Sequence, residues 1–169
     1  MKNLLALVAL SVMCAALIPA TTLAENGLLI GSFTVSYTAG NPGHPTGCDP
    51  SNSVYVEARG IGNSTGALGT AILTIAKCWN YVDGTYAGSF TLSSPDGRDT
   101  VTGTYAGSDD AYAGPFTAFF FPFHGVLTVT AGTGKFKGAS GSLNFTAVAA
   151  VSDAASGIAY YAIEGAGHN

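Results

Sequence analysis

Residues 85–106, TYAGSFTLSSPDGRDTVTGTYA, contain two runs of alternating residues separated by a turn. Pro95, Asp96 and Gly97 form the centre of that turn, because proline and glycine supply the backbone angles that reverse a chain. Alternation of apolar and polar residues is typical of a strand with one buried face. The stretch therefore predicts a β-hairpin with strands at 85–93 and 100–106. The apolar positions that alternate along it are Tyr86, Phe90, Leu92, Val101 and Tyr105.

The same alternation recurs along the chain, and no segment after the first two dozen residues has the pattern of a long amphipathic helix. About eight strands suit an antiparallel barrel or sandwich. A closed barrel leaves no unpaired strand edge, so we expect an all-β fold with a single eight-stranded antiparallel barrel. The other strands expected are 31–37, 53–59, 69–77, 125–130, 142–149 and 158–164.

The composition excludes several classes of protein. Only 9% of the 169 residues are charged and 47% are hydrophobic, which is not the composition of a disordered chain. The net charge is −4, and the six Lys and Arg are scattered along the sequence. Nucleic acids and anionic membrane surfaces are bound through clustered cations, so we expect neither as a partner.

The first two dozen residues have the pattern of a secretory leader. Met1–Asn3 carries positive charge, Leu4–Ile18 is apolar, and Thr22–Ala24 resembles a small-residue cleavage site. The apolar segment is too short for a membrane span. We therefore expect a signal peptide at 1–24 and a secreted or periplasmic barrel domain at 25–169.

Removal of the leader would remove Cys14 and leave two cysteines, Cys48 and Cys78. An exported chain with an even number of cysteines predicts a disulfide between them. Two free thiols are the alternative, and a metal site needs more ligands than this pair supplies. Cys14 also opens a lipid-anchored alternative, against which the bulky Met13 before it argues.

Residues 126–141, VLTVTAGTGKFKGASG, join two expected strands through a glycine-rich turn. Glycine permits tight turns, positive φ and close packing, and the single phenylalanine of the turn would fill one end of the barrel. The pattern strand, Gly-Thr-Gly-basic-Phe-x-Gly-Ala-x-Gly, strand resembles that of dirigent proteins and related allene oxide cyclase-like barrels. It is also similar to bacterial exported proteins of unknown function with that fold. The residues expected to be structural here are Gly132, Gly134, Phe136, Gly138 and Gly141.

The resemblance extends from about Leu68 to Ala149 and includes Leu68-Gly69 and the turn Asp96–Asp99. It implies a calycin-like eight-stranded barrel with a hydrophobic cavity, often assembled as a trimer, and hence a homo-oligomer. The polar interior residues that the plant enzymes use have no counterparts that we can match in this chain. The resemblance therefore carries over no catalytic residue and implies no cofactor.

Three charged residues are candidates for the polar part of a ligand cavity. Glu57 and Arg59 lie two apart on one expected strand and so share a face, and Glu164 lies on the last strand. Inside the barrel they would orient a polar ligand group, because a buried charge needs a partner. On the outside they would be ordinary exposed charges, and this is the placement we favour for Glu57 and Arg59.

No other group of residues has the spacing of a metal or catalytic site. His44, His124 and His168 are far apart in the sequence, and no Gly-x-Ser-x-Gly motif accompanies the serines. Asp109 and Asp110, with Asp83, lack the spacing of a calcium loop, so we expect solvated turns. We therefore expect no catalytic residue and no metal.

The segment Phe116–Phe123 carries five phenylalanines interrupted by Pro122. We expect it to be part core and part subunit interface, because exposed apolar patches usually mark contacts. Tyr160 and Tyr161 must point to opposite faces of the last strand, so one of them faces outward.

Three functional hypotheses are compatible with this sequence. The favoured one is a non-enzymatic secreted barrel that binds a small apolar ligand. The second is an isomerase or cyclase of the allene oxide cyclase or dirigent type, for which a carboxylate in the cavity, Glu57 or Glu164, would be needed. The third is a structural or oligomeric envelope-associated protein that assembles through the phenylalanine segment.

Overall fold

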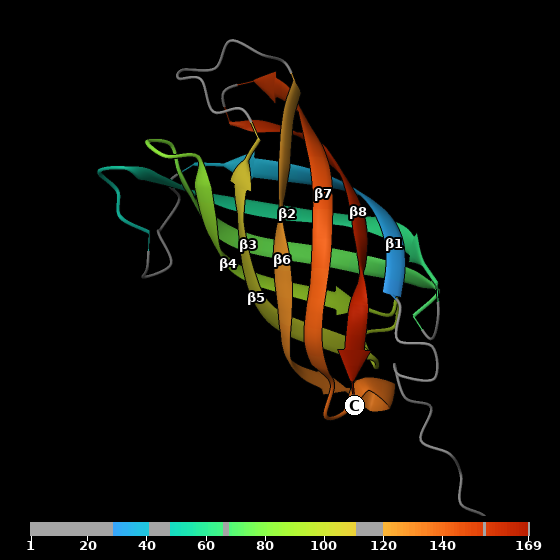
Figure 1. Cartoon of the computed structure of the whole chain (residues 1–169). Helices are drawn as coiled ribbons and strands as arrows, with labels where there is room; N and C mark the ends of the chain where they lie inside the picture. The colour runs from blue at the N-terminus through green and yellow to red at the C-terminus, as the bar shows by residue number, and fades with distance from the viewer. Residues whose placement is uncertain (1–28, 41–47, 66–67, 111–119, 154, 169) are drawn as a thin grey trace, which may run out of the picture.

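The computed structural model describes residues 29–40, 48–65, 68–110, 120–153 and 155–168, so the expected leader lies outside the described residues. The strands form one closed barrel in which each pairs antiparallel with the next and β8 pairs with β1 (Figure 1). The expected eight-stranded antiparallel barrel is confirmed. The strands are β1 (Leu29–Ala39), β2 (Ser53–Ser64), β3 (Thr70–Asn80), β4 (Thr85–Ser93), β5 (Thr100–Asp109), β6 (Phe120–Thr133), β7 (Ser140–Asp153) and β8 (Ser156–His168).

The barrel interior is built by the alternating apolar positions of every strand. In β3, Ala71, Leu73 and Ile75 point inward and are buried. In β8, Tyr161 is buried while its neighbour Tyr160 is exposed, as the alternation predicts. Because neighbouring residues of a strand point to opposite faces, the pattern of period two decides which side chains form the core.

One end of the barrel is closed by the glycine-rich turn between β6 and β7. The 3₁₀ turn η1 (Gly134–Phe136) places the Phe136 ring in the core. Gly134 and Gly138 have φ of +58° and +88°, a conformation that side chains disfavour. A Cβ atom on Gly132 would lie 2.2 Å from the carbonyl oxygen of Phe136, so the two backbones meet only because this residue is glycine.

Strand β6 begins earlier than the sequence indicates. Pro122 was expected to interrupt the phenylalanine segment, yet β6 runs through it, with Pro122 opposite Val148 of β7. Proline lacks only the donor, and its carbonyl accepts a hydrogen bond of 3.0 Å from the Asp110 N–H. Of the phenylalanines in the segment, Phe123 is buried, Phe120 is exposed, and Phe116 and Phe119 lie outside the described residues.

The Cys48–Cys78 disulfide is present and joins the segment before β2 to the outer face of β3. Cys78 lies opposite Tyr55 of β2 and Ala87 of β4 in the sheet. The bond therefore fixes the chain beside the open end of the barrel, opposite the end closed by Phe136.

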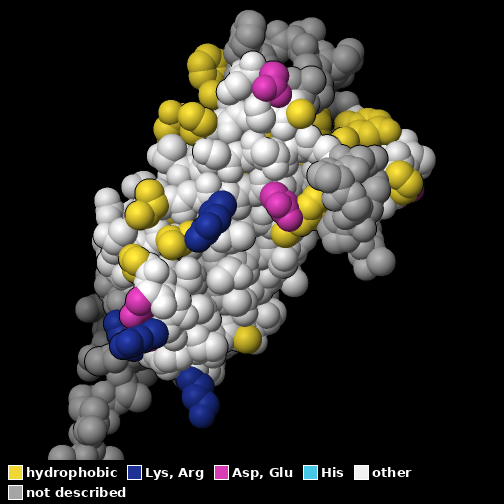
Figure 2. All heavy atoms as spheres, turned by 180° about the vertical axis from the view of Figure 1, so that it is seen from behind, with side chains coloured by type: hydrophobic (Ala, Val, Ile, Leu, Met, Phe, Trp, Pro, Cys, Tyr) yellow, Lys and Arg dark blue, Asp and Glu magenta, His cyan; other side chains and the backbone are white. Residues whose placement is uncertain are grey.

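The outer surface carries few charges. Figure 2 shows the face behind that of Figure 1, on which Lys, Arg, Asp and Glu side chains are few and scattered, with one acidic and one basic side chain side by side at the lower left. No stripe of cations crosses this face. In the part of the chain that the structure describes, no helix has the length and hydropathy of a membrane span.

Candidate ligand-binding site

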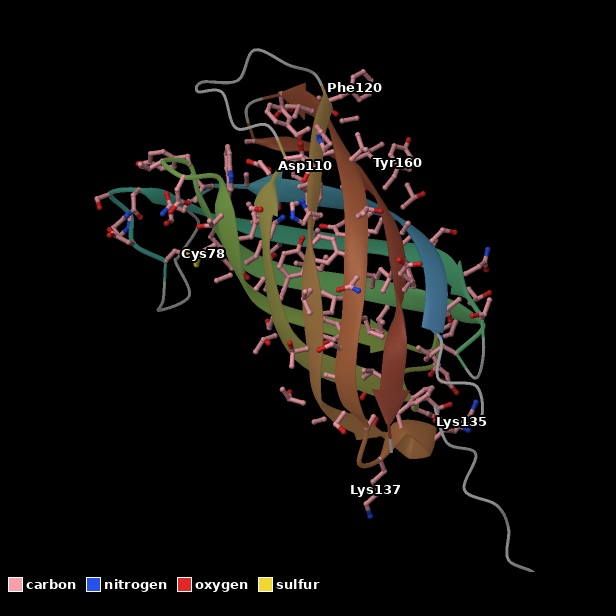
Figure 3. All side chains as sticks on the ribbon, viewed as in Figure 1. Cys78, Asp110, Phe120, Lys135, Lys137 and Tyr160 are labelled. Atoms are coloured by element: carbon pink, nitrogen blue, oxygen red, sulfur yellow. A yellow bond between two sulfur atoms is a disulfide. The ribbon has the colours of Figure 1, made fainter. Side chains whose placement is uncertain are left out.

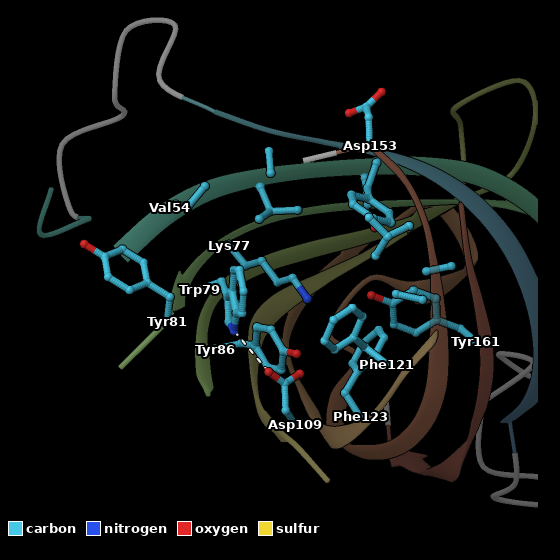
Figure 4. Close-up of a pocket in the computed structure, with 17 residues that line it drawn as sticks. Val54, Lys77, Trp79, Tyr81, Tyr86, Asp109, Phe121, Phe123, Asp153 and Tyr161 are labelled. Carbon is cyan, nitrogen blue, oxygen red and sulfur yellow. Dashed lines mark hydrogen bonds between the residues drawn. The ribbon is translucent and has the colours of Figure 1, made fainter. Parts of the chain in front are cut away.

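A cavity of about 180 Å³ opens at the end of the barrel opposite η1 (Figure 4). All eight strands contribute to it, because the ends of β1, β3, β5 and β7 and the beginnings of β2, β4, β6 and β8 meet there. Most of the wall is apolar, including Val54, Val56, Ala58, Ala149, Val151 and Ala159. A small concave site with an apolar wall and few polar groups is the usual form of a small-molecule site.

The floor of the cavity is a cluster of aromatic rings. The Tyr105 and Phe145 rings stack with centroids 4.8 Å apart, and the Phe123 ring meets Tyr161 edge-on at 5.4 Å. Tyr86 packs against Phe123 at 5.6 Å. Such ring pairs stabilise a core beyond the apolar area that they bury, so the floor is a rigid surface.

Lys77 is the one charged residue that is buried in the described part of the chain, with only 6% of its surface exposed. Its position follows from the alternation of β3, because it is the next inward position after Ile75. The side chain extends from the wall toward Phe121 and Tyr161 (Figure 4). A buried ammonium is costly unless neighbouring groups stabilise it.

Aromatic faces surround the Lys77 amine. Its Nζ atom lies 3.7 Å from the centroid of the Tyr86 ring, 4.7 Å from that of Phe123 and 5.0 Å from that of Tyr105. The Nζ atom also donates a long hydrogen bond of 3.5 Å to the Tyr105 hydroxyl. Among the described residues, no carboxylate lies within ion-pair distance of it. Cation–π contacts therefore replace the ion pair that a buried lysine usually has.

Burial sets the protonation of this amine. Loss of hydration lowers the pKa of Lys77 to about 7, and the negative charge of Asp109 offsets part of that effect. Near neutral pH the amine is therefore present in both its protonated and its neutral form. A neutral lysine amine is a nucleophile and a base, which an exposed lysine at the same pH is not.

Asp109, at the end of β5, lies at the same cavity. Its Oδ2 atom accepts a hydrogen bond of 3.2 Å from the Trp79 indole N–H, whereas Oδ1 is buried without a hydrogen-bond partner among the described residues. Burial raises the pKa of this carboxyl to about 6, although the Trp79 hydrogen bond and the charge of Lys77 lower it. A buried carboxylate oxygen without a hydrogen-bond partner is unusual in a folded protein.

Two buried tyrosines complete the polar groups of the floor. The hydroxyls of Tyr105 and Tyr161 are 3.3 Å apart and share a hydrogen bond. Burial raises the pKa of both phenols well above its ordinary value, so they stay neutral. Lys77, Tyr105 and Tyr161 thus form a chain of hydrogen bonds, of which Lys77 and Tyr161 line the cavity.

The three charged residues proposed for the cavity lie elsewhere. Glu57 and Arg59 alternate with the buried Val56 and Ala58 and therefore point outward, and Glu164 follows the buried Ile163 in the same way. The Tyr55 hydroxyl donates a hydrogen bond of 2.8 Å to Glu57 on the outer surface. Glu57 and Arg59 thus have the outward placement that the sequence favours. The alternative, that any of the three residues lines the cavity, is corrected, because each occupies the outward position of its strand and none is among the lining residues.

The histidine and aspartate candidates are also separate from the cavity, with the exception of Asp109. His124 is exposed and contacts Asp110 through its Nδ1 atom. Asp83 accepts hydrogen bonds from the backbone and hydroxyl of Thr85, which stabilise the turn before β4. His44 and the side chain of His168 lie outside the described residues. Within the described ranges, no group of three or more His, Cys, Asp and Glu could hold a metal ion.

Sequence reasoning missed Lys77 and its partner Asp109. The sequence pattern that indicates a buried Lys77 is its place at the end of the inward series of Ala71, Leu73 and Ile75, where a lysine is unusual. Asp109 was considered only with Asp110 and Asp83 as a solvated loop. Its burial depends on the closure of β5 onto Trp79 of β3, which spacing along the chain does not reveal.

The fold and site define a class of protein: a closed antiparallel barrel with one sealed end, one open end and a buried lysine at the open end. Comparison with protein-family models, curated proteins and solved structures found no match to this chain.

Proposed function

We propose that this chain is an exported barrel that binds a small apolar ligand of about one aromatic ring in its open end. The observation that carries the proposal is the cavity of about 180 Å³ with an aromatic floor and the buried Lys77 in its wall. An apolar protein cavity of about 150 Å³ is known to accept benzene, so one ring fits a space of this size. Lys77 would attract the polar or electron-rich end of the ligand.

Two further features support export and ligand binding. The disulfide fits an oxidising compartment, to which the leader pattern of residues 1–24 also points. The closed barrel is the fold that the resemblance to dirigent and allene oxide cyclase-like proteins implies, and membership of that calycin-like group is part of the proposal. A cyclase activity lacks the carboxylates first considered, because Glu57 and Glu164 face outward.

Ligand binding can be measured with the protein's own fluorescence, because Trp79 is the single tryptophan and lines the cavity. Titration with nitrobenzene, an apolar single-ring quencher, should give saturable quenching. Ala149→Phe places a ring in the cavity and should weaken the apparent affinity by about tenfold or more, since it occupies the ligand's volume. Ala162→Phe, on the outer face of β8, is the matched control and should bind as the wild type does.

Quenching that rises linearly without saturation, equally in all three proteins, would show collisions with an exposed indole and contradict the proposal. Circular dichroism of each variant establishes that the barrel is intact.

A second candidate role, assembly into homo-oligomers, is favoured by one feature of the outer surface. Phe120 and Tyr160 are 65% and 54% exposed and project near the same end of the barrel (Figure 3). The sheet register connects them, because Val148 lies opposite Tyr160, and Ala150 lies opposite both Phe120 and Ile158. We name these residues of β6, β7 and β8 the outer apolar patch: Phe120, Val148, Ala150, Ile158 and Tyr160.

If copies of the chain meet at the outer apolar patch, light scattering should give a mass above that of one chain, and this mass should fall on dilution. The double substitution Phe120→Ser and Tyr160→Ser should give the monomer at all concentrations, because it removes the two most exposed rings of the patch. Val82→Ser removes an equally exposed side chain in the turn between β3 and β4 and should leave the mass unchanged. A wild-type protein that is monomeric throughout would exclude this role.

A further inference from the structure

We propose that Lys77 captures carbonyl compounds: its amine forms an imine with a small aromatic or apolar aldehyde that occupies the open end of the barrel. The inference rests on the proposed ligand-binding function and adds to it the chemical class of the ligand. It follows from where the amine lies, what surrounds it and which group stands beside it in the same cavity.

Nζ belongs to a residue of the cavity wall and is not held in an ion pair by a described carboxylate. Lys77 lines the cavity, yet its exposed surface is only 6%. The atom faces the space that a ligand would enter, and its neighbours are the rings of Tyr86, Phe123 and Tyr105. A structural lysine would be paired with a carboxylate at close range, and no described carboxylate is within ion-pair distance. A desolvated lysine in an apolar pocket is the form in which this residue attacks carbonyl groups.

The reaction balances without an oxidant or reductant. The neutral Nζ lone pair forms a bond to the carbonyl carbon while the C=O π pair moves to oxygen, and a proton passes from nitrogen to that oxygen. The resulting carbinolamine then loses its hydroxyl with a further proton as water, and the nitrogen lone pair forms the C=N bond. One amine and one aldehyde thus give one imine and one water.

Asp109 is the group that can move these protons. Its Oδ1 atom has no hydrogen-bond partner among the described residues, and Oδ2 is oriented by the Trp79 N–H. Burial raises the pKa of this carboxyl to about 6, so a fraction of it is protonated near neutral pH and can protonate the departing hydroxyl. The aromatic rings around Nζ shield the amine on the side away from the opening of the cavity.

The capture can be trapped chemically. The folded protein is incubated with benzaldehyde near pH 7.5, reduced with sodium cyanoborohydride and mapped by peptide mass spectrometry. Lys135 and Lys137, at the other end of the barrel, are exposed lysines in the same molecule and serve as internal references (Figure 3). Lys77 should be benzylated roughly tenfold to a hundredfold faster than either, because far more of its amine is neutral at this pH.

Two variants separate the parts of the proposal. Lys77→Arg keeps a cation but cannot form an imine, so rapid labelling should disappear, whereas Lys137→Arg, at an exposed position outside the cavity, should leave both the rapid labelling of Lys77 and the saturable nitrobenzene quenching unchanged. Asp109→Asn should slow labelling of Lys77 about tenfold and remove the fall in labelling rate above about pH 7, where loss of the Asp109 proton is no longer offset by deprotonation of Lys77. An unchanged rate and pH profile in Asp109→Asn would overturn the role of that carboxyl.

The capture of carbonyls and the binding function fail in different ways. If Lys77 is labelled no faster than Lys137 while nitrobenzene still quenches Trp79 saturably, imine formation is overturned and ligand binding stands. If neither selective labelling nor saturable quenching occurs, both proposals are overturned.

Discussion

The free energy of unfolding of the wild type should rise by about 3–4 kcal/mol between pH 7 and roughly pH 10, and replacing Lys77 with methionine should abolish this rise. In the wild type the folded chain releases the Lys77 proton with a pKa of about 7, whereas the unfolded chain holds it up to about 10.5. Over that window the unfolded state binds the extra proton. Stability therefore increases as the pH rises, and the cost of the buried ammonium is fully present below pH 7.

The measurement is urea-induced unfolding of both proteins at several pH values across this range, with the difference between them plotted against pH. The groups that face Lys77, namely Asp109 of β5, Tyr105, Tyr86 and Tyr161, are retained in the variant, so the difference reports the amine together with its effect on the pKa of Asp109. Methionine has a similar length and no charge, and fits the aromatic surroundings. Lys137→Met, at an exposed position, should show no such pH-dependent difference. A difference that is constant with pH would refute the lowered pKa and the neutral amine with it.

The architecture could be predicted from the sequence because the physical rule behind it is local. Residues two apart in a strand share a face. Ala71, Leu73 and Ile75 therefore indicate a buried face even when the neighbouring strands are unknown. The hairpin of β4 and β5 follows from its turn, and its register pairs Leu92 with Val101. Closure of the sheet follows from the cost of leaving edges unpaired.

The site could not be predicted in the same way, because it is assembled from residues far apart in the chain. Lys77 and Tyr105 are 28 positions apart, and Tyr105 and Tyr161 are 56 apart. Only the curvature of the closed sheet brings them to one point. The alternation of β3 places Lys77 on the inward face. A lysine at the end of a strand can also extend into solvent, and the sequence alone does not choose between the buried and the exposed placement. Glu57 and Arg59 share one face of β2, but that alone does not say whether the face is inside or outside the barrel. Their alternation with the buried Val56 and Ala58 shows that they point outward.

The other large effect expected is that of the disulfide. Cys48 and Cys78 are 30 residues apart, and a cross-link that closes such a loop restricts the unfolded chain by about 3–4 kcal/mol. The double substitution Cys48→Ser and Cys78→Ser should therefore lower the free energy of unfolding by about that amount. Denaturant unfolding of the two proteins measures the loss. A loss below about 1 kcal/mol would contradict the expectation.

The same variant separates the stability of the fold from the integrity of the site. Cys78 points to the outer face of β3, whereas its neighbours Lys77 and Trp79 point to the cavity. The backbone pairing of β3 with β2 and β4 continues through these residues without help from the disulfide, with Cys78 opposite Tyr55 and Ala87. Where the double variant is folded, it should therefore still show saturable quenching of Trp79 by nitrobenzene. Loss of quenching in a folded variant would mean that the disulfide shapes the cavity as well as stabilising the barrel.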